Sequence, residues 1–175
     1  ALFDIRDKNR AYADPAYPSA SFYLNAGEVE SKGWEVETSG NILPGLDVIA
    51  GYTRLSTRYL SDRTNLGKDF SIQSPRHQLK LWGNYRFRAD SPYAGFSAGL
   101  GLLAQSDTQS TRGWRNQLLE GGYAVVNARI AYQIDKSHSV SLMINNLFDR
   151  KYYETVGTPN IYNFYGERSE EHTSE

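Results

Sequence analysis

Three polar segments carry side chains that suit ligand binding: arginine and aromatic residues in two of them, and aromatic residues alone in the third. An arginine can bind an anionic group, and an aromatic ring can stack on a planar ligand or on a cation. The candidates lie in segments 111–122, 61–74 and 156–165, and they are Arg112, Trp114, Arg115, Arg63, Tyr162 and Phe164. We expect these residues to contact a ligand by charge and ring stacking, with Trp114 between its two arginines as the first choice. The alternative is that they are solvated surface residues.

The acidic and histidine residues give little support for catalysis or metal binding. Four glutamates lie along one segment, where paired carboxylates can perform acid–base chemistry: Glu28, Glu30, Glu35 and Glu37. We expect a polar row on the inner face of a sheet instead, matched by lysines and arginines of adjoining strands. His77 and His172 are dispersed, and the chain has no cysteine, so we predict no metal site. We also predict that the protein is not an enzyme and binds no cofactor directly.

These residues must be positioned by strands, because the sequence alternates with a period of two and shows almost no helical period. Residues Leu79, Leu81 and Tyr85 point one way in this pattern, while Lys80 and Trp82 point the other. Seven strands are predicted, at about residues 1–12, 27–42, 46–60, 76–88, 96–110, 123–134 and 139–155. Most reach about 12–16 residues, whereas strands of globular proteins usually have about 5–6.

The connections between the predicted strands alternate in length. Short ones at 43–45, 89–95 and 135–138 alternate with longer ones at 13–21, 61–74, 111–122 and 156–165. This order predicts an all-β fold, an antiparallel up-and-down meander. Long strands with one apolar face, short turns at one end and long loops at the other are typical of a transmembrane β-barrel. Since seven strands do not close such a barrel, we expect one arc of a larger wall, with the glutamate row facing its lumen.

The composition agrees with a sheet that has one polar face. Hydrophobic residues make up 39% of the 175 residues and aromatic residues 13%, with 13 tyrosines. Tyrosines near strand ends, such as Tyr152 and Tyr153, are expected where lipid meets water. The net charge of −1 carries no basic excess, so no nucleic-acid partner is expected.

Five segments in this order resemble the late barrel region of TonB-dependent outer-membrane receptors, particularly the ferric-siderophore group. They are NAGEVESKGWEVETSG (25–40), LPGLDVIAGYT (43–53), SPRHQLKLWGNYRF (74–87), GGYAVVNARIAYQI (121–134) and INNLFDRKYYETVG (144–157). The NNLFD segment with its two tyrosines is the most specific. The resemblance covers residues 1–167.

The resemblance implies a 22-stranded barrel in the bacterial outer membrane that takes up a ferric siderophore. It also implies contact with outer-membrane lipid, a plug inside the barrel, and coupling to the TonB complex through a region preceding Ala1. The loop residues named above would then contact the ferric chelate or face lipopolysaccharide. Two alternatives stay open: a soluble or outer-membrane β-barrel that binds another small ligand such as haem or cobalamin, and an outer-membrane hydrolase.

The carboxyl end departs from the family pattern. Residues 168–175 read RSEEHTSE, whereas the family continues into a last strand that ends in an aromatic residue. This octapeptide resembles the translation of a sequencing adapter. We therefore expect residues 1–167 to be barrel and residues 168–175 to be a non-native tail.

Overall fold

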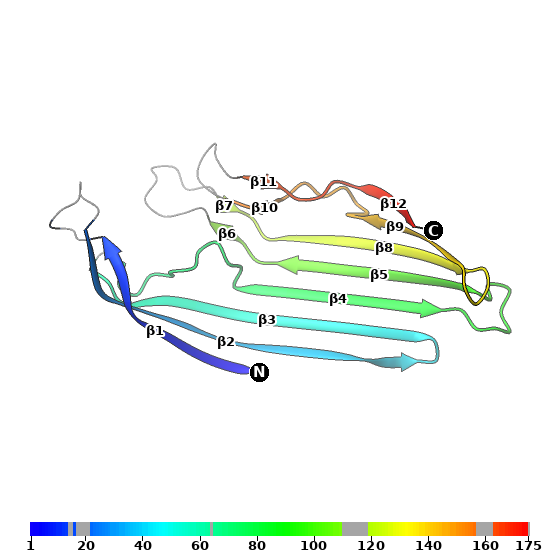
Figure 1. Cartoon of the computed structure of the whole chain (residues 1–175), viewed down its shortest axis with the longest axis horizontal. Coiled ribbons are helices and arrows are strands. Elements are labelled where there is room, and N and C mark those ends of the chain that lie inside the picture. Colours follow the sequence, from blue (N-terminus) through cyan, green and yellow to red (C-terminus); the bar gives the residue numbers. More distant parts are fainter. Residues whose placement is uncertain (14–15, 17–21, 64, 110–118, 157–162, 175) are drawn as a thin grey trace.

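The computed structural model describes residues 1–175 except 14–15, 17–21, 64, 110–118, 157–162 and 175 (Figure 1). Eight strands form one antiparallel sheet, in the order β1 (Leu2–Ala13), β2 (Tyr23–Leu43), β3 (Leu46–Ser61), β4 (His77–Arg86), β5 (Phe96–Gln105), β8 (Tyr123–Gln133), β9 (Ser139–Asn145) and β12 (Glu170–Ser174). Two small hairpins lie outside this sheet: β6 (Thr108–Gln109) with β7 (Leu119–Glu120), and β10 (Tyr153–Thr155) with β11 (Phe164–Tyr165). No helix among the described residues is long and apolar enough to cross a membrane.

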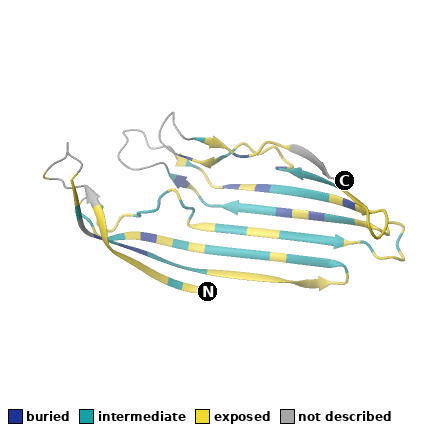
Figure 2. Ribbon diagram, viewed as in Figure 1, coloured by how far each residue is buried: buried dark blue, intermediate teal, exposed yellow. Residues whose placement is uncertain are grey.

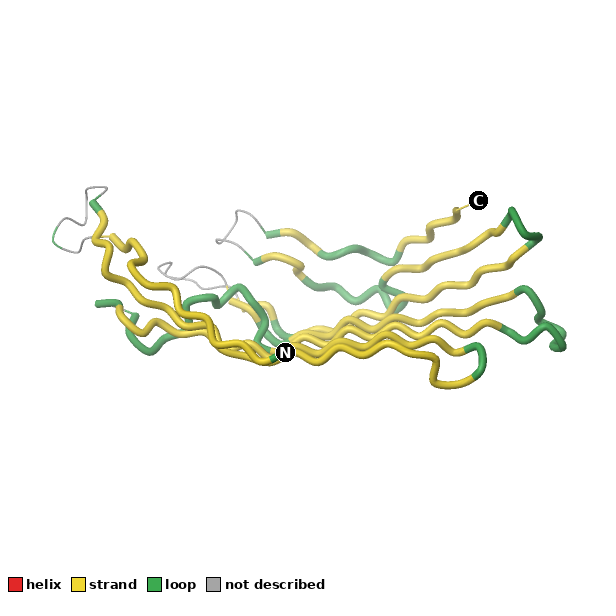
Figure 3. Tube along the Cα trace, turned by 60° about the horizontal axis from the view of Figure 1, so that its bottom comes forward, coloured by secondary structure: helices red, strands yellow, loops and turns green. Residues whose placement is uncertain are grey.

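The predicted all-β meander is confirmed, because neighbours in the sheet are also neighbours along the chain. The three short turns lie at one end of the sheet and the longer connections at the other (Figure 1). Gly45 permits the tightest turn: its φ is +89°, and a Cβ there would approach the Arg86 carbonyl oxygen to 2.5 Å. The sheet is open, with β1 and β12 at its edges, and it curves into a trough (Figure 3).

The two faces of the sheet differ in the way that a membrane wall requires. Residues that lie directly opposite each other on neighbouring strands share a face of the sheet. Leu81, Leu102 and Val126 are opposed in this way, so they form an apolar row across β4, β5 and β8. Leu100 and Ile130 on this face are 60% and 56% exposed. The other face includes Gly101, which is buried. Because the curvature of the sheet brings side chains together on its inner side, this buried face is the concave one. A water-soluble sheet would cover its apolar face instead. Figure 2 shows how little of this sheet is buried.

Aromatic residues border the apolar part of the convex face at two levels. Trp34 packs on Tyr52 with ring centroids 5.0 Å apart, and the Tyr52 hydroxyl lies 2.7 Å from Nδ1 of His77. The second group includes Phe87, Phe96 and Tyr132, the last two with centroids 4.5 Å apart. His77 and Phe87 are ten residues apart along one line. At about 3.3 Å per residue and a tilt of about 40°, that span is ~25 Å, the height of the apolar band of an outer-membrane barrel.

The prediction that the seventh strand runs over residues 139–155 is wrong. It ends at Asn145, and Asn146 (φ +49°) and Asp149 (φ +47°) turn the chain. The Asn146 side chain is 1% exposed. It supplies hydrogen bonds to backbone groups that no longer pair with a neighbouring strand. Its Nδ2 donates to the carbonyl oxygens of Arg150 (2.9 Å) and Glu167 (2.8 Å), and its Oδ1 accepts from the Arg150 N–H (2.8 Å). Inside a membrane no water can hydrogen-bond the backbone groups that strand pairing leaves unpaired, so these groups need partners within the protein.

The residues that follow this turn also differ from the prediction. Tyr152 packs on Tyr123 with ring centroids 4.2 Å apart and ring planes tilted by 34°, and Tyr123 lies opposite Gln105 on the concave face. Tyr152 therefore does not occupy the expected lipid interface. Further on, β12 pairs with β9 through the backbone. This pairing does not test whether residues 168–175 are native, which stays a prediction.

On β1 to β3 the polarity of the two faces is exchanged beyond the row Trp34–Tyr52–His77. Glu30, Lys32 and Arg58 continue the convex face there, because Glu30 lies opposite Arg58 and Lys32 is two residues from Trp34. The concave face at the same level carries Val29, 2% exposed, and Leu55. The expected single row of glutamates facing the lumen is thus wrong for Glu30. It lies five residues from Glu35, so the two alternate to opposite faces.

Candidate functional site

An arginine and two aromatic rings meet on the concave face at the long-loop end. The guanidinium carbon of Arg10 on β1 lies 5.3 Å from the ring centroid of Phe70, which is the geometry of a cation–π contact. Tyr59 on β3 contacts the same phenyl ring edge-on, with centroids 6.0 Å apart and planes at 72°. The three residues come from three separate segments, and together they form the Arg10–Tyr59–Phe70 cluster.

The connection between β3 and β4 folds back to build this cluster. Its backbone is fastened to Tyr59 on both sides: the Tyr59 N–H donates to the Lys68 carbonyl and the Gly67 N–H donates to the Tyr59 carbonyl, both at 2.9 Å. The turn between them is closed by the Asn65 N–H, which donates to Oδ1 of Asp62 at 2.6 Å. A cavity of about 170 Å³ lies beside Tyr59 and Arg10. A loop that is fixed to the strand in this way can present rings at defined positions.

A second cavity, of about 180 Å³, lies on the same face and is polar. Thr57 Oγ1 accepts the Ser71 N–H at 3.2 Å, and the Ser71 and Ser74 hydroxyls are 2.8 Å apart. Arg76 forms an ion pair with Asp69 at the rim. This cavity offers hydroxyl and charged groups next to the aromatic cluster, so one ligand could use both.

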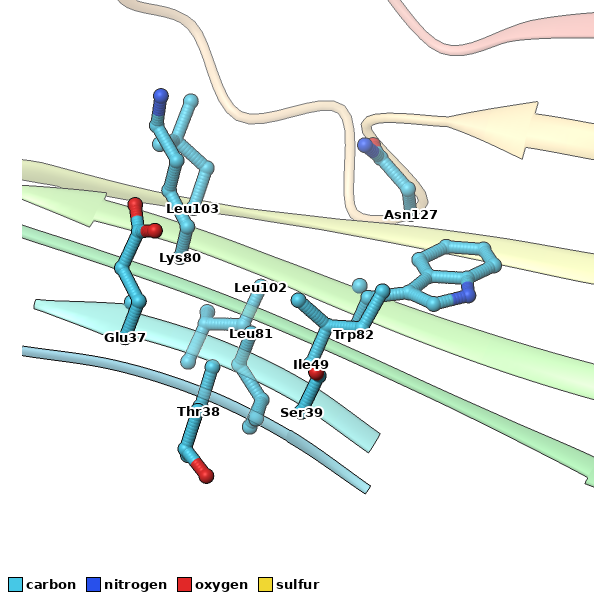
Figure 4. A pocket seen from close by; sticks show the side chains of 13 residues that line it. Glu37, Thr38, Ser39, Ile49, Lys80, Leu81, Trp82, Leu102, Leu103 and Asn127 are labelled. Carbon is cyan, nitrogen blue, oxygen red and sulfur yellow. The ribbon is translucent and has the colours of Figure 1, made fainter. Parts of the chain in front are cut away.

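Farther along the lumen side, Trp82 lies across two glycines of β5. A Cβ at Gly99 or Gly101 would come within 2.7 Å and 2.8 Å of the indole, so the flat ring requires both glycines. A cavity of about 550 Å³ beside it is lined by Glu37 and Lys80 among others. Figure 4 shows Glu37, Lys80, Leu103, Trp82 and Asn127 on this side, while Thr38, Leu81 and Leu102 point away. This part of the lumen wall therefore combines charged and amide side chains with the indole of Trp82 and the apolar Leu103.

The residues proposed from the sequence are only partly placed. Arg112, Trp114, Arg115 and Tyr162 fall outside the described residues. Arg63 is exposed in the connection between β3 and β4, and Phe164 is 59% exposed in the β10–β11 hairpin. Neither lines the cavities described above. Their roles as ligand contacts stay predictions.

Sequence reasoning missed Arg10 and Tyr59, and it covered Phe70 only through the segment 61–74. An arginine in a strand and an aromatic residue 60 positions later carry no joint signal in the sequence. Their contact depends on the sheet register and on the folded connection. The described part of the chain holds no group of three or more His, Cys, Asp or Glu residues arranged to bind a metal.

Comparison with known proteins gives close relatives over almost the whole chain. It is 39% identical over 169 residues to the ferric-pyoverdine M114 receptor PbuA of Pseudomonas sp. (strain M114), covering 95% of this chain and 20% of that protein. It is 30% identical to the ferripyoverdine receptor of Pseudomonas aeruginosa (90% and 20%) and 29% identical to the ferrichrome outer membrane transporter/phage receptor of Escherichia coli K12 (95% and 21%). The chain spans about a fifth of each relative.

Solved structures agree with this comparison. The P. aeruginosa receptor FpvA bound to a heterologous ferric pyoverdine superposes with a TM-score of 0.81 at 29% identity, covering 96% of this chain and 23% of that one. The FpvAI–pyocin S2 complex gives a TM-score of 0.82 at 30% identity, with 96% and 22% coverage. The family model described as "TonB dependent receptor-like, beta-barrel" matches residues 1–147. With its lipid-facing convex side, its aromatic borders and its alternating connections, the chain therefore belongs to the β-barrel family of the TonB-dependent receptors of the outer membrane.

Proposed function

We propose that the receptor containing this segment takes up a ferric siderophore across the outer membrane, with energy supplied through TonB. The segment contributes barrel wall and long loops to this transport, and it performs no enzymatic reaction. The observation that carries the proposal is the Arg10–Tyr59–Phe70 cluster on the lumen side of the loop end. It occurs in a chain similar to receptors that are named for ferric pyoverdine and ferrichrome.

The chemistry of the cluster matches a ferric chelate. Such ligands are bulky, often anionic and partly aromatic, so Arg10 supplies charge while Phe70 and Tyr59 supply ring surfaces. The adjacent polar cavity around Ser71 and Ser74 suits hydroxyl or amide groups of the same ligand. We include the loop residues as further contacts: Arg112, Trp114, Arg115, Arg63, Tyr162 and Phe164. Coupling to TonB is assigned to a region outside this chain.

Ligand binding by the full-length receptor tests this proposal. We expect Arg10→Ala combined with Phe70→Ala to weaken binding of the ferric siderophore about tenfold or more, because the charge of Arg10 and the ring surface of Phe70 are lost. Binding is measured by quenching of intrinsic fluorescence, and transport by uptake of radioactive iron in cells with and without TonB. Arg88→Ala combined with Tyr93→Ala is the matched control, since this exposed pair lies at the short-turn end.

The ligand panel separates siderophores from other cargo. Ferric pyoverdine, ferrichrome and a ferric catecholate are compared with haem and cobalamin. Transport of haem or cobalamin alone, or iron uptake that does not depend on TonB, would contradict the proposal. Equal loss of binding in the control variant would show that the cluster is not the contact.

A further inference from the structure

The convex face carries a charged cluster immediately beyond its aromatic border, where the polarity of the sheet is exchanged. It consists of Asp4 and Arg6 on β1, Glu30 and Lys32 on β2, and Arg58 on β3, and we name it the outer charge cluster. The register sets these residues in two rows, Asp4↔Lys32 and Arg6↔Glu30↔Arg58. Lys32 is two residues from Trp34, so the first row lies about 7 Å beyond the border.

Glu30 organises the three cations from beneath. Its side chain is 2% exposed, and its oxygens lie 2.6 Å from Nε of Arg58, 2.8 Å from Nζ of Lys32 and 3.2 Å from Nη2 of Arg6. The contacts of Oε1 are charge contacts that lack hydrogen-bond geometry. Asp4 adds a 3.3 Å contact to Lys32. One buried carboxylate thus holds three basic side chains side by side on the outside of the wall.

The basic groups keep unused donors that face outward. An arginine has five N–H donors and a lysine three, and Glu30 engages one end of each group. The side chains of Arg6, Lys32 and Arg58 remain 51%, 42% and 52% exposed. Ion pairs whose basic partner is about half exposed contribute little to stability, so stability alone is a weak reason for holding three cations around one carboxylate. A fixed set of cations around one position fits a multiply charged oxyanion.

The location selects the kind of anion. The cluster lies outside the apolar band by about one headgroup layer, on the side that faces lipid and away from the lumen. Basic clusters at this depth recognise anionic lipid headgroups. Arg54, opposite Trp34 on the same face, adds a further cation at the border, which leaves four cations against two carboxylates. We propose that the outer charge cluster binds a phosphate group of a glycolipid in the outer leaflet of the membrane.

The test compares lipid binding by the full-length receptor with and without the cluster. The receptor is placed in nanodiscs of phosphatidylcholine with or without bis-phosphorylated lipid A, and bound lipid is counted by native mass spectrometry. The variant is Glu30→Gln/Lys32→Gln/Arg58→Gln, which removes two cations together with the carboxylate beneath them. Since each basic residue near a membrane surface contributes about 1 kcal/mol, we expect lipid A to bind roughly thirtyfold more weakly.

Two controls make the result decisive. Asp47→Asn/Arg86→Gln removes an ion pair of 2.8 Å on the concave face and should leave lipid A binding unchanged. Lys32→Gln alone keeps Glu30 paired with two arginines, and it should give a partial loss even if the triple variant folds poorly. Equal lipid A binding by wild type and both cluster variants would overturn the proposal. So would displacement of lipid A by inorganic phosphate, which would indicate a site for a soluble anion.

The outcome is independent of the transported ligand. Uptake of ferric siderophore should persist in the triple variant wherever the receptor reaches the membrane. A loss of lipid binding with normal uptake supports this proposal by itself, while normal lipid binding with no siderophore binding would contradict only the proposed function.

Discussion

Strands β2 and β3 have opposite polarity at their two ends. Between the aromatic borders the convex face is apolar and the concave face is mostly polar, as with Val36 and Ala50 outside against Glu37 and Asp47 inside. Beyond Trp34 and Tyr52 the convex face carries Glu30 and its cations, and the concave face carries Val29 and Leu55. Because the backbone alternation continues unchanged, only the surroundings can explain the exchange. The solvent on the outside changes from hydrocarbon to water and headgroups at this level.

The largest effect is expected from a charge placed in the lipid-facing half. Leu100→Arg puts a guanidinium on the convex face, where Leu100 is 60% exposed. A basic residue at the bilayer midplane costs about 2–4 kcal/mol in a transmembrane barrel. We expect a strong fall in the amount of receptor in the outer membrane. We also expect a strong fall in the fraction that migrates on a gel as the folded, heat-modifiable form.

Leu103→Arg is the control on the concave face, beside Lys80 in the register. It should be tolerated, since that side faces the lumen. Equal damage by both arginines would remove the distinction between the two faces.

A smaller effect is expected where the wall is interrupted. Asn146→Ala removes a buried amide that makes three hydrogen bonds to backbone groups. A buried donor or acceptor left without its partner costs about 1–3 kcal/mol. Protease cleavage between β9 and β12 and the thermal midpoint of the full-length receptor measure this loss. The less buried neighbour gives the comparison: Asn145→Ala should change both by less, and a reversed order would contradict the role assigned to Asn146.

The smallest effect concerns a turn outside the membrane-spanning strands. The Ser137 backbone N–H (2.7 Å), together with the His138 side chain, holds the pKa of Asp135 below its ordinary value. A carboxyl with a lowered folded-state pKa adds stability above its unfolded pKa, and this stability is lost as pH falls through the folded value. Asp135→Asn should therefore flatten the acid side of the stability profile slightly in thermal melts. An unchanged profile below the ordinary aspartate pKa would contradict this assignment.

The strands were accessible from the sequence because side-chain direction alternates with every residue. The row Leu79, Leu81, Tyr85 and the opposing Lys80 and Trp82 follow from that alternation alone, as do the two ends defined by short and long connections. The end of β9 was not accessible. The polar Asn145 and Asn146 follow the apolar positions Leu142 and Ile144, but the residue types alone do not show that strand pairing stops there. Only the side-chain hydrogen bonds of Asn146 make a break in the ladder acceptable.

The candidate site depended still more on tertiary structure. The sequence located loops rich in arginine and aromatic residues, because binding side chains concentrate there. It did not join Arg10 to Phe70, since that contact requires the bulged end of β1 and a connection folded back onto Tyr59. The sequence analysis also placed Glu30 on the lumen face, although counting along the strand puts Glu30 and Glu35 on opposite faces. The three basic partners of Glu30 could be found only from the register between the strands.

By itself, the sequence determined that this chain is a wall of long antiparallel strands with one face for lipid, because alternation and connection length are local properties. The tertiary structure decided which residues meet across that wall. Contacts such as Arg10 with Phe70, and Glu30 with Arg6 and Arg58, join distant positions, and the register between strands has no counterpart in any single stretch of sequence.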